Sequence, residues 1–430
     1  MTIAAELLGF IDSAPSPYHA VDVVASRLRA AGFADVSRTD GSSTAIGAPG
    51  GGYWRRGGAI IAWFVPDVGP DAAVRIIGAH TDSPNLRIKP RPDLAGYGMR
   101  RLAAEPYGGV LLNSWLDRDL GLSGRVAVRG TDGVVSEHLF RDDRPLVRVP
   151  QLAIHLDREI NDKGLLLNRQ QHLNPVWGIG TTYDGEFLDW ITEAAAVGDA
   201  EVLAWDAMCH DTLPSGFLGP DEDLISAARI DNLCSCFGAL HALLAAAEDE
   251  AAGHISLIAL FDHEEIGSET ATGAAAPLLT NVLERLSAAR GATAEERARA
   301  LVGSRILSAD MAHGTHPNYP ERHEPNHPIA LGGGPVIKVN VNGRYATEAL
   351  TSGEFQAACR VAAVPVQVYS HRADLACGST IGPISAARTA IPTVDVGMAQ
   401  LSMHSIRELM ATSDVAHMVD SFGAWLSAAR

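Results

Sequence analysis

The stretch LIALFDHEEIGS, residues 257–268, joins an apolar run to a cluster of acids. The apolar run is typical of a buried strand, and Asp262, His263, Glu264 and Glu265 follow it directly. Neighbouring carboxylates repel one another, and the repulsion costs more when they are partly desolvated. Such a cluster at a strand end needs protons or a cation to be tolerable. The stretch therefore raises the question of which other residues could hold a cation beside it.

Strands and helices alternate on both sides of this stretch. Helical patterns cover 3–13, 18–32, 231–249, 272–304, 352–363 and the chain from about 415. Strand patterns cover 58–66, 72–80, 255–262, 305–312, 335–340, 364–370 and 391–397. Alternation of this kind predicts an α/β fold in which helices cover both faces of a sheet.

The middle of the chain has a different pattern. Residues 93–223 contain short β-like pieces separated by Gly, Pro and Asp turns, with few helical patterns. We interpret this region as a β-rich insertion between two parts, 1–92 and 224–430, of one discontinuous α/β domain.

Composition narrows the classes of function. The formal net charge of -17 over 430 residues disfavours DNA, RNA and anionic lipid as partners. No uncharged apolar stretch reaches the roughly 18 residues of a membrane span, and the N-terminal residues lack the basic and apolar regions of a secretory signal. We therefore expect a cytoplasmic protein without nucleic-acid or membrane partners, whose five cysteines are reduced thiols.

Polar side chains recur where the predicted strands end, which is where open α/β sheets build their sites. They comprise His80 and Asp82, Asp231 at a helix start, Glu264 and Glu265, Asp310 and His313, and His404. Singly, each has a structural alternative: Asp231 as a helix N-cap, His404 as a core histidine, Asp310 as a turn residue. Together they supply the mixed nitrogen and oxygen ligands that Zn²⁺ or a similar divalent ion prefers, with one carboxylate left over to bridge two ions.

The sequence lacks the motifs of serine hydrolases and of dinucleotide-binding proteins. The GxSxG pattern of serine hydrolases is absent, and no GxGxxG follows a strand at a helix start. The histidine-rich tract 316–327 has a spacing that matches no compact metal site, and we interpret it as a proline-laden loop that supports or covers a pocket.

Several longer strings resemble a known family. They are GAHTDSPNLRIKP (78–90), AARIDNL (227–233), FDHEEIGS (261–268), ADMAHGTHPNYPERHEPNHP (309–328), GPVIKVN (334–340) and LSMHSIRE (401–408). Together they resemble the M18 metallopeptidases, the aspartyl aminopeptidases and their bacterial relatives, over nearly the whole chain. The resemblance implies a mixed-sheet, di-zinc exopeptidase-type catalytic domain that is interrupted by a β-rich dimerisation domain.

The resemblance also implies roles for individual residues. The metal ligands would be His80, Asp231, Glu265, Asp310 and His404. Asp231 would bridge two Zn²⁺ ions per subunit, with Co²⁺ or Mn²⁺ as possible substitutes. Glu264 would act as general base, and Asp82 would orient His80. This division makes physical sense, because a bound divalent ion lowers the pKa of its water toward about 7 and a placed carboxylate can then take the proton.

Substrate contacts follow from the same resemblance. They would come from His155, His313, Lys338 and Tyr345, in addition to Glu264 and Asp310. From pattern alone, a strand lysine such as Lys338 is expected to reach solvent; inside the pocket, it would instead pair with an acidic first residue of the peptide. His155 would reach into the site of a neighbouring subunit, in a tetrahedral homododecamer built from dimers.

We therefore expect a zinc aminopeptidase that removes acidic N-terminal residues, Asp or Glu, from peptides with a free N-terminus. One alternative is a di-zinc aminopeptidase of neutral specificity, and another is an amidohydrolase that acts on a non-peptide amide. A non-catalytic assembly protein with the same fold would be expected to lack the base or a ligand, and all of these positions are present.

Overall fold

A nine-stranded sheet forms the α/β part of the computed structural model, which describes residues 1–37, 44–249 and 252–428. Its order is β1 (Ala34–Asp35), β2 (Gly50–Arg56), β3 (Ala59–Val65), β13 (Ile255–Phe261), β4 (Val74–His80), β14 (Arg305–Ala309), β18 (Thr393–Gly397), β16 (Val336–Val339) and β17 (Gln367–Ser370). The four central strands, from β13 to β18, pair in parallel, whereas β3 and β16 flank them antiparallel. The sheet is therefore mixed, as predicted.

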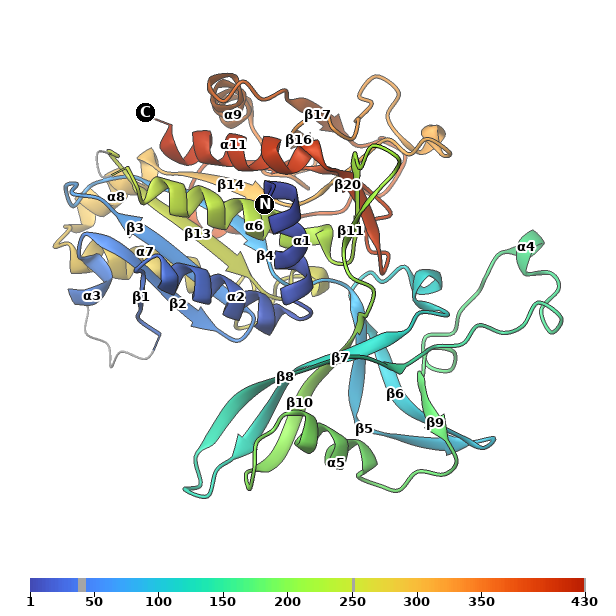
Figure 1. Cartoon of the computed structure of the whole chain (residues 1–430). Coiled ribbons are helices and arrows are strands. Elements are labelled where there is room, and N and C mark those ends of the chain that lie inside the picture. The colour runs from blue at the N-terminus through green and yellow to red at the C-terminus, as the bar shows by residue number, and fades with distance from the viewer. Residues whose placement is uncertain (38–43, 250–251, 429–430) are drawn as a thin grey trace.

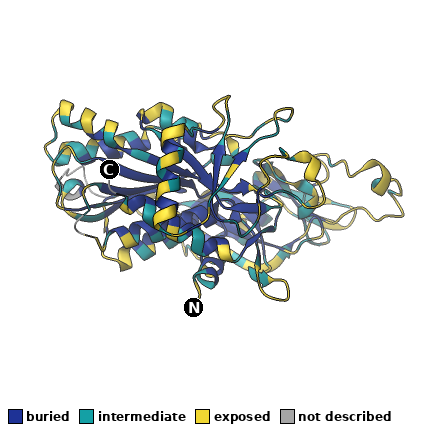
Figure 2. Cartoon of the chain, turned by 90° about the horizontal axis from the view of Figure 1, so that it is seen from above, coloured by how far each residue is buried: buried dark blue, intermediate teal, exposed yellow. Residues whose placement is uncertain are grey.

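Helices cover both faces of this sheet, which confirms the predicted fold class (Figure 1). One face packs on α1 (Ile3–Ser13), α2 (Pro17–Ala30), α6 (Ile230–Ala246), α9 (Ala349–Val361) and α11 (Ser413–Ser427). The other packs on α3 (Thr44–Gly47), α7 (Leu278–Ala289), α8 (Ala294–Gly303) and α10 (Ile381–Thr389). Each face of the sheet has its own hydrophobic core, and alternating side chains of β4 pack into them: Ile77 and Ala79 into the first, and Ile76 into the second. Figure 2 shows the buried strands between helices whose outer sides are exposed.

A second, six-stranded sheet lies below the first in Figure 1. Its order is β8 (Val135–Val147), β7 (Leu120–Arg129), β10 (Glu201–Asp211), β5 (Asn85–Gly96), β6 (Met99–Tyr107) and β9 (Val176–Ile179), and every pair is antiparallel. Helix α5 (Glu186–Ala194) packs Phe187 and Ile191 into its core. The segment between β8 and β9, which carries α4 (Ile160–Lys163), extends away from the rest of the chain.

A third, five-stranded sheet of short strands was not predicted, and it brings distant segments to one place. It consists of β11 (Gly216–Leu218), β12 (Leu224–Ala227), β20 (Glu408–Ala411), β19 (Ala399–Leu401) and β15 (Ala312–His313). Strand β12 leads into α6, and the turn between β19 and β20 carries His404. The sheet therefore sets residues from both ends of the α/β part side by side.

Two local predictions differ from the structure. The helical pattern at 272–304 forms two helices, α7 and α8, because the chain turns at Gly291 with a positive φ of 73°. Helix α10 was not predicted, since its sequence IGPISAART is poor in strong helix formers. The five cysteines are free, as expected. Within the described ranges, no helix is both long and apolar enough to cross a membrane.

Candidate active site

The predicted ligand residues meet where the central strands end. His80 closes β4, Glu264 and Glu265 follow β13 in a short 3₁₀ turn, and Asp310 follows β14. With Asp231 and His404 they line one pocket of about 230 Å³, although they are spread over more than three hundred residues of sequence. The peptide bond between Asp231 and Asn232 is cis.

One ring nitrogen of His80 faces two carboxylates, and a hydrogen bond to the backbone holds the other. Its Nδ1 lies 3.0 Å from the backbone oxygen of Asp82, and because a carbonyl only accepts, this bond places a proton on Nδ1. Its Nε2 lies 3.4 Å from Asp231 Oδ1 and 3.5 Å from Asp310 Oδ1. A second partner that orients the ring in this way is usual for a metal-ligating histidine.

His404 repeats this arrangement on the opposite side of Asp231. Its Nδ1 lies 3.0 Å from the backbone oxygen of Gly109, which precedes the short 3₁₀ helix Leu112–Trp115. Its Nε2 lies 3.4 Å from Asp231 Oδ2 and 3.4 Å from Glu265 Oε2. The two oxygens of Asp231 therefore face two different histidines.

The donor atoms fit a metal ion. One ligand atom each from His80, Asp231 and Glu265 lies within 4.8 Å of the others. Asp231 Oδ1 and Glu265 Oε1 are buried and lack a hydrogen-bond partner in the described part of the chain. Buried carboxylate oxygens without a donor are costly, so a cation at this position would satisfy them. Imidazole nitrogen and carboxylate oxygen are the ligands that zinc accepts.

Electrostatics at the site show how strongly the carboxylates interact. Burial, together with Asp231 and Glu264, raises the pKa of Glu265 well above its usual range. Burial also raises the pKa of Glu264 to about 8; His80 opposes this rise, and Asp310 and Asp82 add to it. The carboxylates outnumber the cationic side chains, which answers the question posed by the acidic stretch: a divalent cation here would offset the repulsion.

The histidines respond to the same field. Burial opposes a charge on His404, but Asp231 and Glu265 outweigh it and raise its pKa to about 10. Burial likewise opposes ionisation of Asp231, but the interactions with His404 and His80 outweigh it and lower its pKa. Each of these groups therefore depends on its neighbours for its charge, as is typical of a functional site.

Asp82 lies behind the ligand residues rather than in the pocket. Its side chain is fully buried, and it accepts hydrogen bonds from the backbone N–H groups of Glu264, at 3.1 Å, and Glu265, at 3.2 Å. The hydroxyl of Tyr107, from β6 in the second sheet, donates to it at 2.7 Å. Asp82 Oδ1 also lies 3.4 Å from His80 Nδ1. It therefore fixes the loop that carries both glutamates.

The predicted substrate residues divide into two groups. His313, Lys338 and Tyr345 line the pocket, and Lys338 is only 3% exposed. Its Nζ lies 3.8 Å from Asp310 Oδ2 and 5.5 Å from the ring centre of Tyr345. The expectation of a solvent-facing lysine is therefore wrong, because Lys338 shares a strand face with Val336, which packs against Tyr345 and Tyr369. His155 is exposed on the segment between β8 and β9 and does not line this pocket.

Tyr107 and Glu408 were not predicted, although they bond the backbone or side chains of predicted site residues. The only signal in the sequence is that Glu408 follows His404 closely. The expectation that the histidine-rich tract 316–327 matches no metal-site spacing is wrong, because residues 323–327 read HEPNH, a formal match to the HExxH zinc motif. The structure places it in turns rather than a helix, with Glu324 bonded to His327, so the ligand geometry of that motif does not form.

Comparison with known proteins identifies the family. The family of aminopeptidase I zinc metalloproteases (M18) matches residues 10–426. A probable M18 family aminopeptidase 2 of Streptomyces avermitilis is 51% identical over 424 residues, which cover 98% of this chain and 96% of that protein.

Solved structures agree with this similarity. A chain in the cryo-EM structure of the Ape4 and Nbr1 complex superposes with a TM-score of 0.94 at 34% identity, covering 99% of this chain and 85% of that one. The mApe1 dodecamer of S. cerevisiae gives a TM-score of 0.86 at 29% identity, covering 99% and 97%. The chain therefore belongs to the M18 family of zinc metalloproteases and is an aminopeptidase.

Proposed function

We propose that this aminopeptidase holds two zinc ions per subunit, bridged by Asp231. The observation that carries the proposal is that Asp231 Oδ1 faces His80 and Oδ2 faces His404. Asp310 would complete the site on the His80 side, and Glu265 would complete the one on the His404 side. The same ligands would accept Co²⁺ or Mn²⁺.

Glu264 would act as the general base of peptide hydrolysis. Zinc bound beside it would polarise the scissile carbonyl and lower the pKa of a water molecule. The carboxylate of Glu264 lines the pocket, and Asp82 fixes this residue by accepting a hydrogen bond from its backbone N–H. That carboxylate can take a proton from the attacking water and return it to the leaving amine.

Lys338 would select an acidic N-terminal side chain. A buried ammonium at the pocket wall favours a carboxylate, because the attraction between unit charges is stronger away from water. One observation favours neutral specificity instead: Asp310 already lies 3.8 Å from the Lys338 ammonium and offsets part of its charge. Substrate competition decides between the two.

Assembly would complete the site. The segment between β8 and β9 exposes apolar side chains, Leu152, Ile154, Leu156 and Leu166, and His155 lies among them. Exposed apolar residues in one segment are typical of an interface. With the structure of a dodecamer among its relatives, we infer that residues 93–223 form an assembly domain, that His155 reaches a neighbour's pocket, and that the subunits form a tetrahedral homododecamer. We place the enzyme in the cytoplasm.

The test is the release of a chromogenic amine from Asp, Glu, Leu and Ala conjugates by zinc-loaded and chelator-treated enzyme. Zinc-dependent release that favours Asp or Glu supports a zinc aminopeptidase of acidic specificity. A preference for Leu or Ala would retain the zinc chemistry and refute the acidic specificity. N-acetylated conjugates serve as the control, because cleavage of a blocked amine would indicate an amidohydrolase instead.

A further inference from the structure

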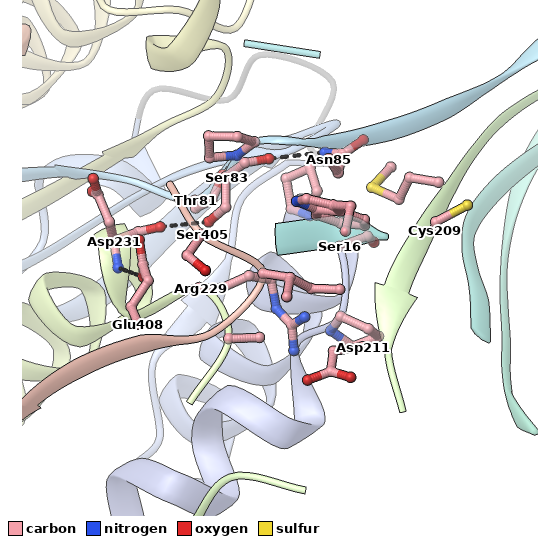
Figure 3. Close-up of a pocket in the computed structure, with 17 residues that line it drawn as sticks. Ser16, Thr81, Ser83, Asn85, Cys209, Asp211, Arg229, Asp231, Ser405 and Glu408 are labelled. Atoms are coloured by element: carbon pink, nitrogen blue, oxygen red, sulfur yellow. Dashed lines mark hydrogen bonds between the residues drawn. The ribbon is translucent and has the colours of Figure 1, made fainter. Parts of the chain in front are cut away.

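Glu408 lies behind the pocket and bonds the backbones of two predicted ligand residues, Asp231 and His404. It opens β20 and is 2% exposed. Its Oε2 accepts a hydrogen bond of 2.9 Å from the backbone N–H of Asp231, and its Oε1 accepts one of 2.7 Å from that of His404. Figure 3 shows Glu408 at the backbone N–H of Asp231 and Ser83 at its carbonyl, to which the Ser83 hydroxyl donates.

Both N–H groups need a partner that regular structure does not supply. Asp231 lies in the first turn of α6, where backbone N–H groups have no acceptor within the helix. His404 lies in the turn between β19 and β20, with a positive φ of 66°. A buried N–H without an acceptor is costly, so one carboxylate that accepts from both constrains both residues at once.

The position of Glu408 is itself fixed by the backbone. In the third sheet, Glu408 pairs with Ala227 at the end of β12, four residues before Asp231. The amide of Gln400, on β19, lies 3.4 Å from Glu408 Oε1. Glu408 is therefore anchored to β12, which leads into Asp231, and to β19, which leads into the turn that carries His404.

We propose that Glu408 is a positioning residue that sets the distance between Asp231 and His404 for zinc binding. This inference rests on the proposed role of these two residues as ligands. It parallels Asp82, which accepts from the backbone N–H groups of Glu264 and Glu265. Zinc bonds to nitrogen and oxygen span only about 2.0–2.2 Å, so a small displacement of either ligand weakens binding.

Asp414 provides a matched control. It is also a fully buried carboxylate that accepts from two backbone N–H groups, those of Gly332 at 2.8 Å and Gly334 at 3.0 Å. Neither glycine is a predicted ligand. Glu408→Gln and Asp414→Asn each replace one of two accepting oxygens by an NH₂ group. Both variants therefore disturb a buried carboxylate that accepts from two backbone N–H groups, but only Glu408→Gln disturbs the proposed zinc site.

The experiment measures the zinc affinity of metal-stripped, full-length protein by competition with a chromophoric chelator. Glu408→Gln is expected to bind zinc about 10- to 100-fold more weakly than the wild type, the usual effect of removing a partner that orients a ligand. Asp414→Asn is expected to bind zinc like the wild type. Thermal unfolding of each metal-stripped variant reports whether the fold is kept.

Three outcomes would overturn the inference. Wild-type affinity in Glu408→Gln refutes the positioning role. An equal loss of affinity in Asp414→Asn attributes the effect to general destabilisation. Should Glu408→Gln not fold, Glu408→Asp draws both oxygens back by one methylene, and wild-type affinity in that variant also refutes the role. His404→Ala separates the two proposals: if it leaves zinc binding unchanged, the ligand assignment fails as well.

Discussion

Removing the hydroxyl group of Tyr107 tests whether the second sheet supports the catalytic loop, which carries Glu264 and Glu265 after β13. Tyr107 belongs to β6, and its hydroxyl donates to the fully buried carboxylate of Asp82 at 2.7 Å. Tyr107→Phe deletes this bond and leaves the ring in contact with Arg87, whose guanidinium lies 4.1 Å from the ring centre. A hydrogen bond to a charged group contributes about 1.5–3 kcal/mol, so the free energy of unfolding should fall by about that amount.

Activity should fall as well. Asp82 keeps its bonds to the backbone N–H groups of Glu264 and Glu265, but it loses the bond that fixes its own orientation. We expect kcat to decrease about tenfold or more, the lower end of the range for groups that orient metal ligands. Urea unfolding gives the stability, and steady-state kinetics with the preferred amino-acid conjugate give kcat.

Tyr18 provides the control for this prediction. Its hydroxyl donates to Asp206 at 3.2 Å, and Arg125 lies 4.2 Å from its ring centre, so Tyr18, like Tyr107, contacts one carboxylate and one guanidinium. Asp206 is partly exposed, and it bonds Tyr18 and Arg125, neither of which is a predicted site residue. Tyr18→Phe should therefore cost stability and leave kcat unchanged. Equal kcat values for the two variants would refute the link between β6 and the catalytic loop.

Three further predictions address the proposed roles. Glu264→Gln should keep zinc and fold but lose at least about a hundredfold in kcat, the scale of general-base loss, and a near-normal rate would refute the base. Lys338→Met should lower kcat/KM for Asp and Glu conjugates relative to Leu and Ala; an unchanged ratio would remove Lys338 from specificity. His155→Ala should lower kcat although His155 lies outside the pocket, whereas His138→Ala, an exposed histidine of β8, should not; equal rates would argue against a shared site.

Local sequence patterns predict the elements and much of the candidate site. The apolar runs before His80, Glu264 and Asp310 form buried strands, and polar residues at the ends of parallel strands meet at one edge of the sheet. Each of these predictions needs only a few neighbouring residues. These patterns therefore place polar residues at one edge of the sheet, whereas the role of each residue follows from the resemblance to the M18 family.

The supporting residues could not be predicted, because their partners are distant. Tyr107 reaches Asp82 across 25 residues, and Glu408 reaches the Asp231 backbone across 177. Nothing in the local pattern around Glu408 says which N–H groups it will accept from. For Lys338, the strand pattern was misleading and only the family resemblance placed it in the pocket: alternation along a strand does not tell which face is solvated when the strand lies inside a sheet covered on both sides.

Zinc stoichiometry tests the central claim, that Asp231 bridges two ions. Metal-stripped enzyme is titrated with zinc, and bound metal is counted per chain. We expect two equivalents for the wild type and one for His404→Ala, which keeps His80 and Asp310 on the other side of Asp231. A single equivalent in the wild type would contradict the account.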